Sequence, residues 1–261
     1  MEISDTGYLL KQQYRTATNL TSRIQLHQRF STNPVPWYHW MFDRFPLHAP
    51  SVVLELGCGA GTLWHENCAR IPSTWTVTLS DFSPGMIADA QRLLQTCAHP
   101  FTFQEINAQD IPFPDATFNI VIANHMLYHV PNRTRALAEV RRVLQQDGVL
   151  YAATNGQEHM HEIYSLIHRF DPQANVEPLT GFTLEQGLIE LQAFFDHVTI
   201  HRYENTLRVT EIEPLVAYVA SNQWLQPEQR DAFANFIAQE LDQHGSIIIT
   251  SAVGVLEGRG A

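Results

Sequence analysis

The chain has 261 residues, 44% of them hydrophobic and only 16% charged, which suits one large domain or two small ones. Its 16 basic and 27 acidic residues give a net charge of −11, and the basic residues are 15 Arg and a single Lys, Lys11. A mechanism built on a catalytic lysine therefore has only that terminal residue to use. A net-acidic chain without a basic run is also a poor partner for nucleic acid, whose phosphates attract clustered Lys and Arg.

Membrane and secretion signals are missing from the pattern. No apolar run approaches the roughly 20 residues that span a bilayer, and the first ten residues do not resemble a signal peptide. Three cysteines, Cys58, Cys68 and Cys97, form no C-x-x-C pair, and an odd count without a secretion signal suits a reducing compartment. We therefore expect a cytoplasmic protein without a membrane partner, acting as a monomer or a homodimer.

Residues 1–46 carry two apolar stripes at helical spacing, which predict a helical N-terminal lid segment. The first stripe follows a helix cap at Asn19, and the second contains Trp37 and Trp40. The aromatic stripe is better explained by a helix packed on a core than by a substrate platform, although a helix that roofs a binding site would satisfy both.

From residue 51 the pattern changes to strands alternating with helices, and each strand is almost continuously hydrophobic. Such strands are typical of a parallel sheet covered on both faces. We predict one α/β domain over 47–261, with a doubly wound, mostly parallel, seven-stranded, Rossmann-like sheet. The predicted strands are 52–56, 75–79, 101–106, 118–123, 149–153, 197–203 and 247–256.

The predicted helices have recognisable starts. Ser83, Asn132 and Thr183 are helix caps in the sequence pattern, and the helix after Asn132 is expected to end near Gly148. After Thr154 the alternation is interrupted by a helix at 158–170 and by a mostly helical stretch at 204–244. The segments at about 155–181 and 204–244 are therefore expected to be helical lid insertions.

A glycine-rich turn joins the first strand to the first helix. It reads Glu55-Leu56-Gly57-Cys58-Gly59-Ala60-Gly61, and Asp81 ends the next strand 20 residues later. Glycines let the backbone turn sharply beside a ligand, and a carboxylate at that place can accept hydrogen bonds from both hydroxyls of a ribose. Thr62 stands where a dinucleotide fingerprint has its last glycine, so the spacing favours one nucleoside without a pyrophosphate.

The residues Val53–Gly61 resemble the first motif of the class I S-adenosylmethionine-dependent methyltransferases. Three further stretches resemble motifs of the same family in the same order. They are Leu79–Ser83, Asn107–Asp115 and Ala136–Gly148. The resemblance covers roughly residues 50–156 and implies S-adenosylmethionine as cofactor, with S-adenosylhomocysteine as product.

The resemblance also implies roles for individual residues. Asp81 would hold the ribose hydroxyls, Phe82 would pack on the adenine, and Glu55 and Asn124 would contact the amino group of the methionine part. Asn107 stands where the family usually has Asp, so its hydrogen bond to adenine loses charge assistance. Arg23 or Arg29 is the candidate for the cofactor carboxylate. The full expected cofactor site is Glu55, Gly57, Cys58, Gly59, Asp81, Phe82, Asn107, Ala108, Asn124 and Arg29.

The loop after the fourth strand reads Asn124-His125-Met126-Leu127-Tyr128-His129-Val130. In an open α/β sheet, ligands lie beyond the carboxyl ends of the strands, so this loop would face the reacting methyl group. His129 is the first candidate for a general base, ahead of His125 and Tyr128. His159, His161 and Glu162 lie close in sequence, but they lack the spacing of a metal site, and no metal is expected.

The acceptor is expected to be a small molecule enclosed by the N-terminal segment and the two insertions. The loop after the fourth strand lacks the N/D-P-P-Y/F motif of amino-group methylation on nucleic-acid bases. The reaction is an in-line displacement onto an O, N or C atom, for which the protein mainly supplies alignment. Two alternatives stay open: a nucleotide-dependent oxidoreductase and a non-catalytic protein that binds S-adenosylmethionine.

Overall fold

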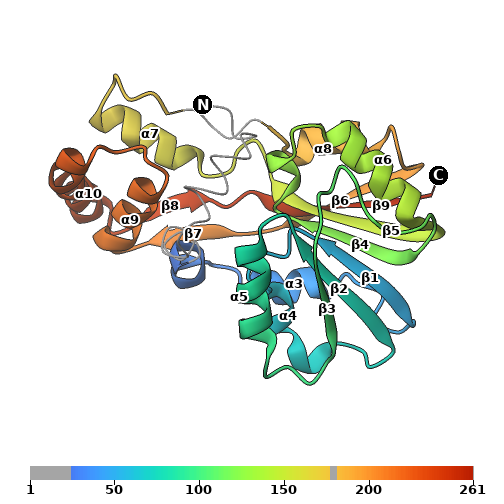
Figure 1. Cartoon of the computed structure of the whole chain (residues 1–261). Coiled ribbons are helices and arrows are strands. Elements are labelled where there is room, and N and C mark those ends of the chain that lie inside the picture. The colour runs from blue at the N-terminus through green and yellow to red at the C-terminus, as the bar shows by residue number, and fades with distance from the viewer. Residues whose placement is uncertain (1–24, 177–180, 261) are drawn as a thin grey trace.

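The computed structural model describes residues 25–176 and 181–260, and a seven-stranded sheet runs through its centre (Figure 1). The strand order is β3-β2-β1-β4-β5-β9-β6. Neighbouring strands are parallel except at β9, which is antiparallel to both β5 and β6. The strands are β1 (Ser51–Leu56), β2 (Trp75–Asp81), β3 (Phe101–Glu105), β4 (Phe118–Asn124), β5 (Leu144–Asn155), β6 (His197–Tyr203) and β9 (Val253–Arg259). The predicted α/β class and mostly parallel sheet are confirmed.

Helices cover both faces of this sheet (Figure 1). One face carries α6 (Arg133–Val143) and α8 (Leu184–Leu191), and the other carries α3 (Trp37–Phe42), α4 (Thr62–Glu66) and α5 (Pro84–Leu94). Side chains alternate along each strand, so Leu54 and Leu56 pack on the α6 side while Val53 packs on the α4 side. Three predicted caps are confirmed, since the side chains of Ser83, Asn132 and Thr183 each accept a hydrogen bond from a first-turn N–H. The fourth, Asn19, lies outside the described residues.

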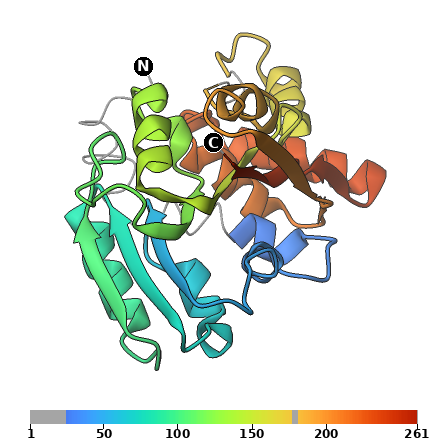
Figure 2. The ribbon, with the colours of Figure 1, turned by 90° about the vertical axis from the view of Figure 1, so that its right-hand side faces the viewer.

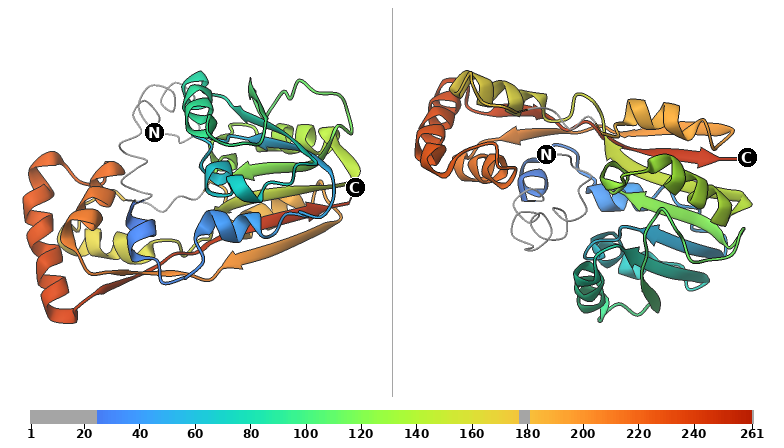
Figure 3. Two further views of the ribbon diagram at one scale, coloured as in Figure 1. Left: turned by 90° about the horizontal axis from the view of Figure 1, so that it is seen from below. Right: turned by 45° about the horizontal axis from the view of Figure 1, so that its top comes forward.

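A second, smaller unit lies beside the sheet (Figures 1 and 3). It is built on a two-stranded sheet and is joined to the main one by the chain between β6 and β7 and between β8 and β9. Its buried residues form a separate apolar core that includes Leu26 and Phe30 from the helical residues 25–30. Its elements are β7 (Thr206–Val209), β8 (Ile247–Thr250), α7 (His161–Phe170), α9 (Ile212–Ser221) and α10 (Arg230–His244).

The two sequence insertions and residues 25–30 thus pack together, beside the domain that carries the glycine turn. Figure 2 views the molecule from the side of the main sheet. Short 3₁₀ turns complete the chain: η2 (Cys68–Arg70), η3 (Leu127–His129) and η4 (Pro227–Gln229).

Three element boundaries differ from the sequence-based prediction. Residues 204–244, expected to be mostly helical, include strand β7. The single strand expected at 247–256 is two strands in different sheets, because the N–H of Ser251 and the carbonyl of Ala252 bond to other segments at the crossing. The helix after Asn132 ends at Val143, and β5 begins at once rather than at residue 149.

The cysteines differ from the expectation of a chain without disulfides. Cys68 in η2 and Cys97 after α5 form a disulfide, with their Cα atoms 5.8 Å apart, and Cys58 is free and buried. The pair is 29 residues apart in sequence and follows no recognisable spacing, so only the fold reveals it. Within the described ranges, no helix is long and apolar enough to cross a membrane.

Candidate active site

The glycine turn after β1 leaves open space beside one glycine only. Gly57, Gly59 and Gly61 all have positive φ, at 69°, 54° and 79°. A Cβ on Gly57 would lie 2.7 Å from the Cβ of Met126, whereas a Cβ on Gly59 would meet no described residue within 4 Å. The turn therefore packs tightly against the loop after β4 at its start and presents bare backbone at Gly59, where a ligand can approach closely.

Asp81 at the end of β2 holds this turn in place. One carboxylate oxygen accepts from the N–H of Gly59 at 3.0 Å, and the other accepts from the N–H of Ser83 at 2.8 Å. Each oxygen keeps a second lone pair for a ligand hydroxyl. Burial raises the pKa of Asp81, and its backbone hydrogen bonds oppose that rise. The next residue, Phe82, is 42% exposed and offers an aromatic surface beside the turn.

Glu55 is a buried carboxyl at the carboxyl end of β1. It is 1% exposed, and the indole N–H of Trp64 donates to its Oε2 at 2.5 Å. Its Oε1 is buried and has no hydrogen-bond partner in the part of the chain that the structure describes. Burial raises the pKa of Glu55 to about 8, and the nearby Asp81 adds to the rise while the Trp64 bond opposes it. The carboxyl is therefore mostly neutral at pH 7.

Asn124 occupies the end of the neighbouring strand β4. Glu55 lies beside Ile122, two residues before Asn124, so both polar side chains leave the sheet on the same face. The Oδ1 of Asn124 is also buried and has no partner among the described residues. Two unsatisfied acceptor oxygens at adjacent strand ends match an ammonium group, which carries several donors and a charge.

Three other predicted cofactor residues have defined surroundings. The Oδ1 of Asn107 accepts from the backbone N–H of Gln109 at 3.0 Å, which forms a turn after β3. Ala108 is buried within that turn. Arg29 is half-exposed and forms an ion pair of 2.6 Å with Glu211, so its guanidinium has a partner other than a cofactor carboxylate. The alternative candidate for that role, residue 23, lies outside the described residues.

The loop after β4 carries all three predicted base candidates. His125 has a positive φ of 54°, and its N–H donates to the carbonyl of Ala153 at 3.0 Å. Tyr128 and His129 belong to η3, with ring centroids 4.4 Å apart. The indole of Trp37, from the predicted aromatic stripe, lies 5.6 Å from the His125 ring. The stripe therefore both covers the core and reaches this loop.

Two further histidines approach this loop, and sequence reasoning missed them. His27 comes from residues 25–30, and His159 comes from the segment between β5 and α7. Their rings stack with centroids 5.7 Å apart and an interplanar angle of 2°. Burial lowers the pKa of His27 and of His125 to about 4, with His27 adding to the shift at His125. No local motif marks these residues, because only the fold brings their segments together.

The neighbouring His161 takes no part in this group. It lies 3.3 Å from Glu162 and 3.8 Å from Glu158, on the exposed start of α7. Among the residues with a described position, no three His, Cys, Asp or Glu side chains are arranged to hold a metal ion.

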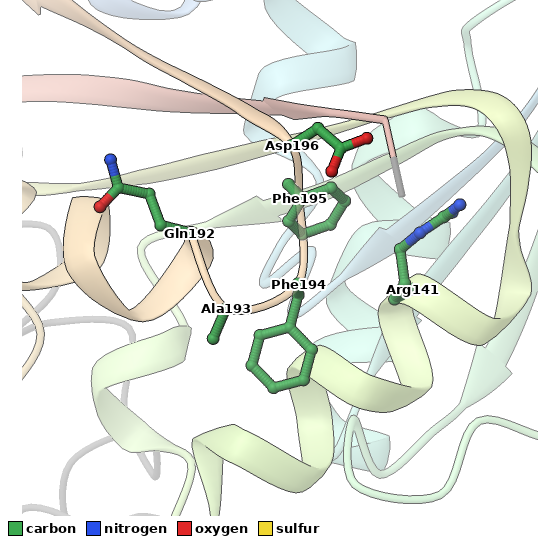
Figure 4. Close-up of a pocket in the computed structure, with 6 residues that line it drawn as sticks. All are labelled: Arg141, Gln192, Ala193, Phe194, Phe195 and Asp196. Carbon is green, nitrogen blue, oxygen red and sulfur yellow. The ribbon is translucent and has the colours of Figure 1, made fainter.

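A separate hollow lies at the opposite end of the sheet (Figure 4). It has a volume of about 630 Å³ and includes Arg141 of α6 and the residues 192–196 that lead into β6. His197, which begins β6, and Val149 of β5 both pair with Arg259 of β9, so they lie at the same height in the sheet. The hollow is therefore at the amino ends of the parallel strands, away from the glycine turn, and it brings together no residue expected to take part in the chemistry.

Comparison with known proteins agrees with the motif order. A family described as a methyltransferase domain matches residues 54–152. The chain is 23% identical over 177 residues to a ubiquinone/menaquinone biosynthesis C-methyltransferase UbiE of Blochmanniella pennsylvanica, covering 66% of this chain and 68% of that one. This match favours the methyltransferase over the oxidoreductase alternative.

Solved structures confirm the architecture. Phosphoethanolamine N-methyltransferase 2 of Haemonchus contortus, solved with phosphomonomethylethanolamine and S-adenosylhomocysteine, has a TM-score of 0.61 at 14% identity, covering 100% of this chain and 60% of that one. The [4+2]-cyclase SpnF has a TM-score of 0.55 at 16% identity, with 95% and 96% covered. The same fold therefore accompanies more than one kind of reaction, and the chemistry has to be argued from the site.

Proposed function

We propose that this chain is a class I S-adenosylmethionine-dependent methyltransferase, because the matched methyltransferase domain agrees with the motif order, and that its cofactor binds at the carboxyl ends of β1, β2 and β4. The acceptor is a small molecule that lies between this site and the second unit. Methyl transfer goes to an O, N or C atom of that molecule. When bound, S-adenosylmethionine supplies an electrophilic methyl group on a sulfonium.

One observation carries the cofactor assignment: the buried Oε1 of Glu55 and Oδ1 of Asn124 lack partners among the described residues. An unpaired buried polar atom costs about 1–3 kcal/mol, so a fold keeps it where a ligand satisfies it. The amino group of the methionine part fits both oxygens. Trp64 fixes the orientation of Glu55 by donating to its other oxygen.

The rest of the cofactor would follow the backbone that the glycines leave bare. Open space beside Gly59 accommodates the ligand, and the adjoining Gly57 and Cys58 hold the turn against its neighbours. The second lone pairs of Asp81 accept from the ribose hydroxyls, and the exposed ring of Phe82 packs on the adenine. The turn formed by Asn107 and Ala108 offers polar atoms to the adenine edge.

Proton removal from the acceptor, where the acceptor has a proton to lose, falls to the loop after β4. A base is most effective when its pKa lies near the working pH. The pKa of His125 is lowered to about 4 by burial, so its imidazole is a weak base. We keep His129 as the proposed base, with Tyr128, whose ring lies 4.4 Å away, as a positioning residue. His129→Ala should lower turnover by about 10²–10⁴-fold at unchanged cofactor affinity, and unchanged turnover would remove His129 from the mechanism.

Ligand binding tests the cofactor assignment directly. S-adenosylhomocysteine should raise the melting temperature of the protein, and NADH should not. Glu55→Gln should weaken S-adenosylhomocysteine binding by at least about tenfold, because it removes a charge-assisted contact of about 1.5–3 kcal/mol. Glu66→Gln, which changes an exposed carboxylate on α4, is the matched control. Equal affinity of both variants would contradict the role of Glu55.

Methyl transfer itself requires a separate readout. Transfer of labelled methyl groups to a panel of small metabolites distinguishes an enzyme from a protein that only binds the cofactor. We also propose that the protein is cytoplasmic, where Cys68 and Cys97 would be held reduced. It acts as a monomer or homodimer and takes no nucleic acid as partner. The net charge of −11 supports the last point, and size-exclusion chromatography with light scattering tests the oligomeric state.

A further inference from the structure

Three imidazoles from separate segments meet beside the loop after β4, and we call them the histidine cluster: His27, His125 and His159. All three are half-buried. The rings of His27 and His159 are stacked, and both His27 and His125 lower the pKa of His159. His27 likewise lowers the pKa of His125, so the three rings lie within electrostatic reach of one another.

The histidine cluster is neutral and has no charged partner in the part of the chain that the structure describes. Burial lowers the pKa of His159 well below its usual value and lowers the other two to about 4. Throughout the described ranges, the histidines that pair with carboxylates are His161 and His201, outside the cluster. No carboxylate contributes to the pKa shift of any cluster member. Among the residues with a described position, a bound molecule would therefore meet neither an anion nor a cation at the cluster.

The cluster nevertheless offers hydrogen bonds and flat surfaces. The Nδ1 of His159 and the indole N–H of Trp37 are buried, and neither has a hydrogen-bond partner in the described segments. The His159 ring also has a backbone hydrogen bond at Ala252, which opposes the lowering of its pKa by burial. Trp37 lies 5.6 Å from His125, and the ring of Tyr218 lies 6.4 Å from His27. A neutral imidazole carries one donor and one acceptor nitrogen, which complements a hydroxyl group. Aromatic walls complement a planar ring.

We propose that the histidine cluster binds the methyl acceptor, and that the acceptor is an uncharged planar ring compound with a hydroxyl group on the ring. An ammonium acceptor would lose its hydration here without gaining an anion, and a carboxylate or phosphate would gain no cation. His27, His125 and His159 thus determine acceptor specificity by excluding charged molecules. This inference rests on the proposed function, since His125 directly follows Asn124 of the cofactor site.

Four phenol-sized probes test the charge rule. Tyrosol, tyramine and 4-hydroxyphenylacetate share one ring but carry an uncharged, a cationic and an anionic tail, and 4-methoxyphenethyl alcohol lacks the phenolic hydroxyl. Each is titrated, up to about 10 mM, into ¹⁵N-histidine-labelled protein saturated with S-adenosylhomocysteine. Tyrosol should shift the ring signals of the cluster with a Kd at least about tenfold below the other three. The exposed His65 of α4 serves as an internal control and should not shift.

The titration of the wild-type protein tests whether the cluster binds an uncharged acceptor. Equal or tighter binding of either charged probe at the cluster would overturn the proposal, and so would a cluster that does not respond to tyrosol. His159→Phe keeps a ring but removes the hydrogen bonds, so it should abolish tyrosol binding at unchanged affinity for S-adenosylhomocysteine, whereas His65→Phe should change neither. Failure of the proposed function is seen separately, as absence of S-adenosylhomocysteine binding by calorimetry.

Discussion

Because we propose that Glu55 contacts the amino group of the cofactor, we expect cofactor binding to depend on a proton at this carboxyl. With a pKa of about 8, its carboxyl is protonated in the ligand-free protein at pH 7. An ammonium group placed beside Oε1 favours the ionised form, because an opposite charge at contact distance lowers the pKa of a carboxyl. We therefore expect the protein to release a proton when S-adenosylhomocysteine binds, although the ligand itself keeps its charge.

The size of this effect follows from the pKa. A group with a pKa of about 8 is about nine-tenths protonated at pH 7, half protonated at pH 8 and one-tenth protonated at pH 9. If the carboxyl is fully ionised in the complex, binding releases about 0.9, 0.5 and 0.1 protons at these three values. The same linkage strengthens S-adenosylhomocysteine binding by about fivefold between pH 7 and pH 8.

Isothermal titration calorimetry measures the released protons directly. Binding enthalpy is recorded in buffers of different ionisation enthalpy, and the slope gives the number of protons. Glu55→Gln should bring the slope close to zero at pH 7, and Glu66→Gln should leave it at about 0.9. A wild-type slope near zero, or a slope that persists in Glu55→Gln, would refute the assignment of the proton to Glu55. The second result would point to Asp81, whose pKa is also raised by burial.

Three further predictions concern the loops and the fold. Gly59→Ala places a methyl group in open space at positive φ, so S-adenosylhomocysteine affinity should fall at least about tenfold while the free energy of unfolding falls by only about 1 kcal/mol. Gly57→Ala, whose Cβ would lie 2.7 Å from a neighbour, should mainly lower the free energy of unfolding. Calorimetry and urea unfolding that rank both variants alike would contradict this. Reduction of Cys68–Cys97 should lower the unfolding free energy by about 3–4 kcal/mol, and equal urea midpoints with and without dithiothreitol would argue against it. The pKa of His125 in the folded protein lies below its ordinary 6.5, so the stability it contributes is present above pH 6.5 and lost between pH 6.5 and 4, by at most about 3 kcal/mol. His125→Gln should flatten this pH dependence of the free energy of unfolding. Parallel curves of unfolding free energy against pH for the wild type and the variant would show that His125 is not responsible.

The main sheet was predictable because its determinants are local. Buried parallel strands read as short apolar runs, and the caps at Ser83, Asn132 and Thr183 occupy the positions that their side chains suggest. The glycine turn and Asp81 were predictable for the same reason, since each follows a strand directly. The motif thus indicated the cofactor end of the sheet before any contact was known.

Long-range pairing was not predictable from such patterns. The run Ile247–Leu256 looks like one strand, but it crosses from one sheet to another at Ser251 and Ala252, where hydrogen bonds to distant segments decide its course. Strand β7 was not predicted within 204–244, because its four residues are too few to show the alternating pattern of a strand beside the helical pattern of their neighbours. Even the disulfide depends on two segments meeting in space rather than on cysteine spacing.

Four buried polar atoms that lack a hydrogen-bond partner among the described residues belong to the proposed site, on Glu55, Asn124, Trp37 and His159. Glu55 and Asn124 lie at adjacent strand ends, His125 follows Asn124, and Trp37 and His159 approach His125 from other segments. Each buried atom without a partner costs about 1–3 kcal/mol, and well-folded proteins keep few of them. These unpaired atoms should lower the stability of the ligand-free protein where the ligands are proposed to bind. Cofactor and acceptor should therefore stabilise the fold beyond what either contributes alone, because each satisfies different atoms of this group.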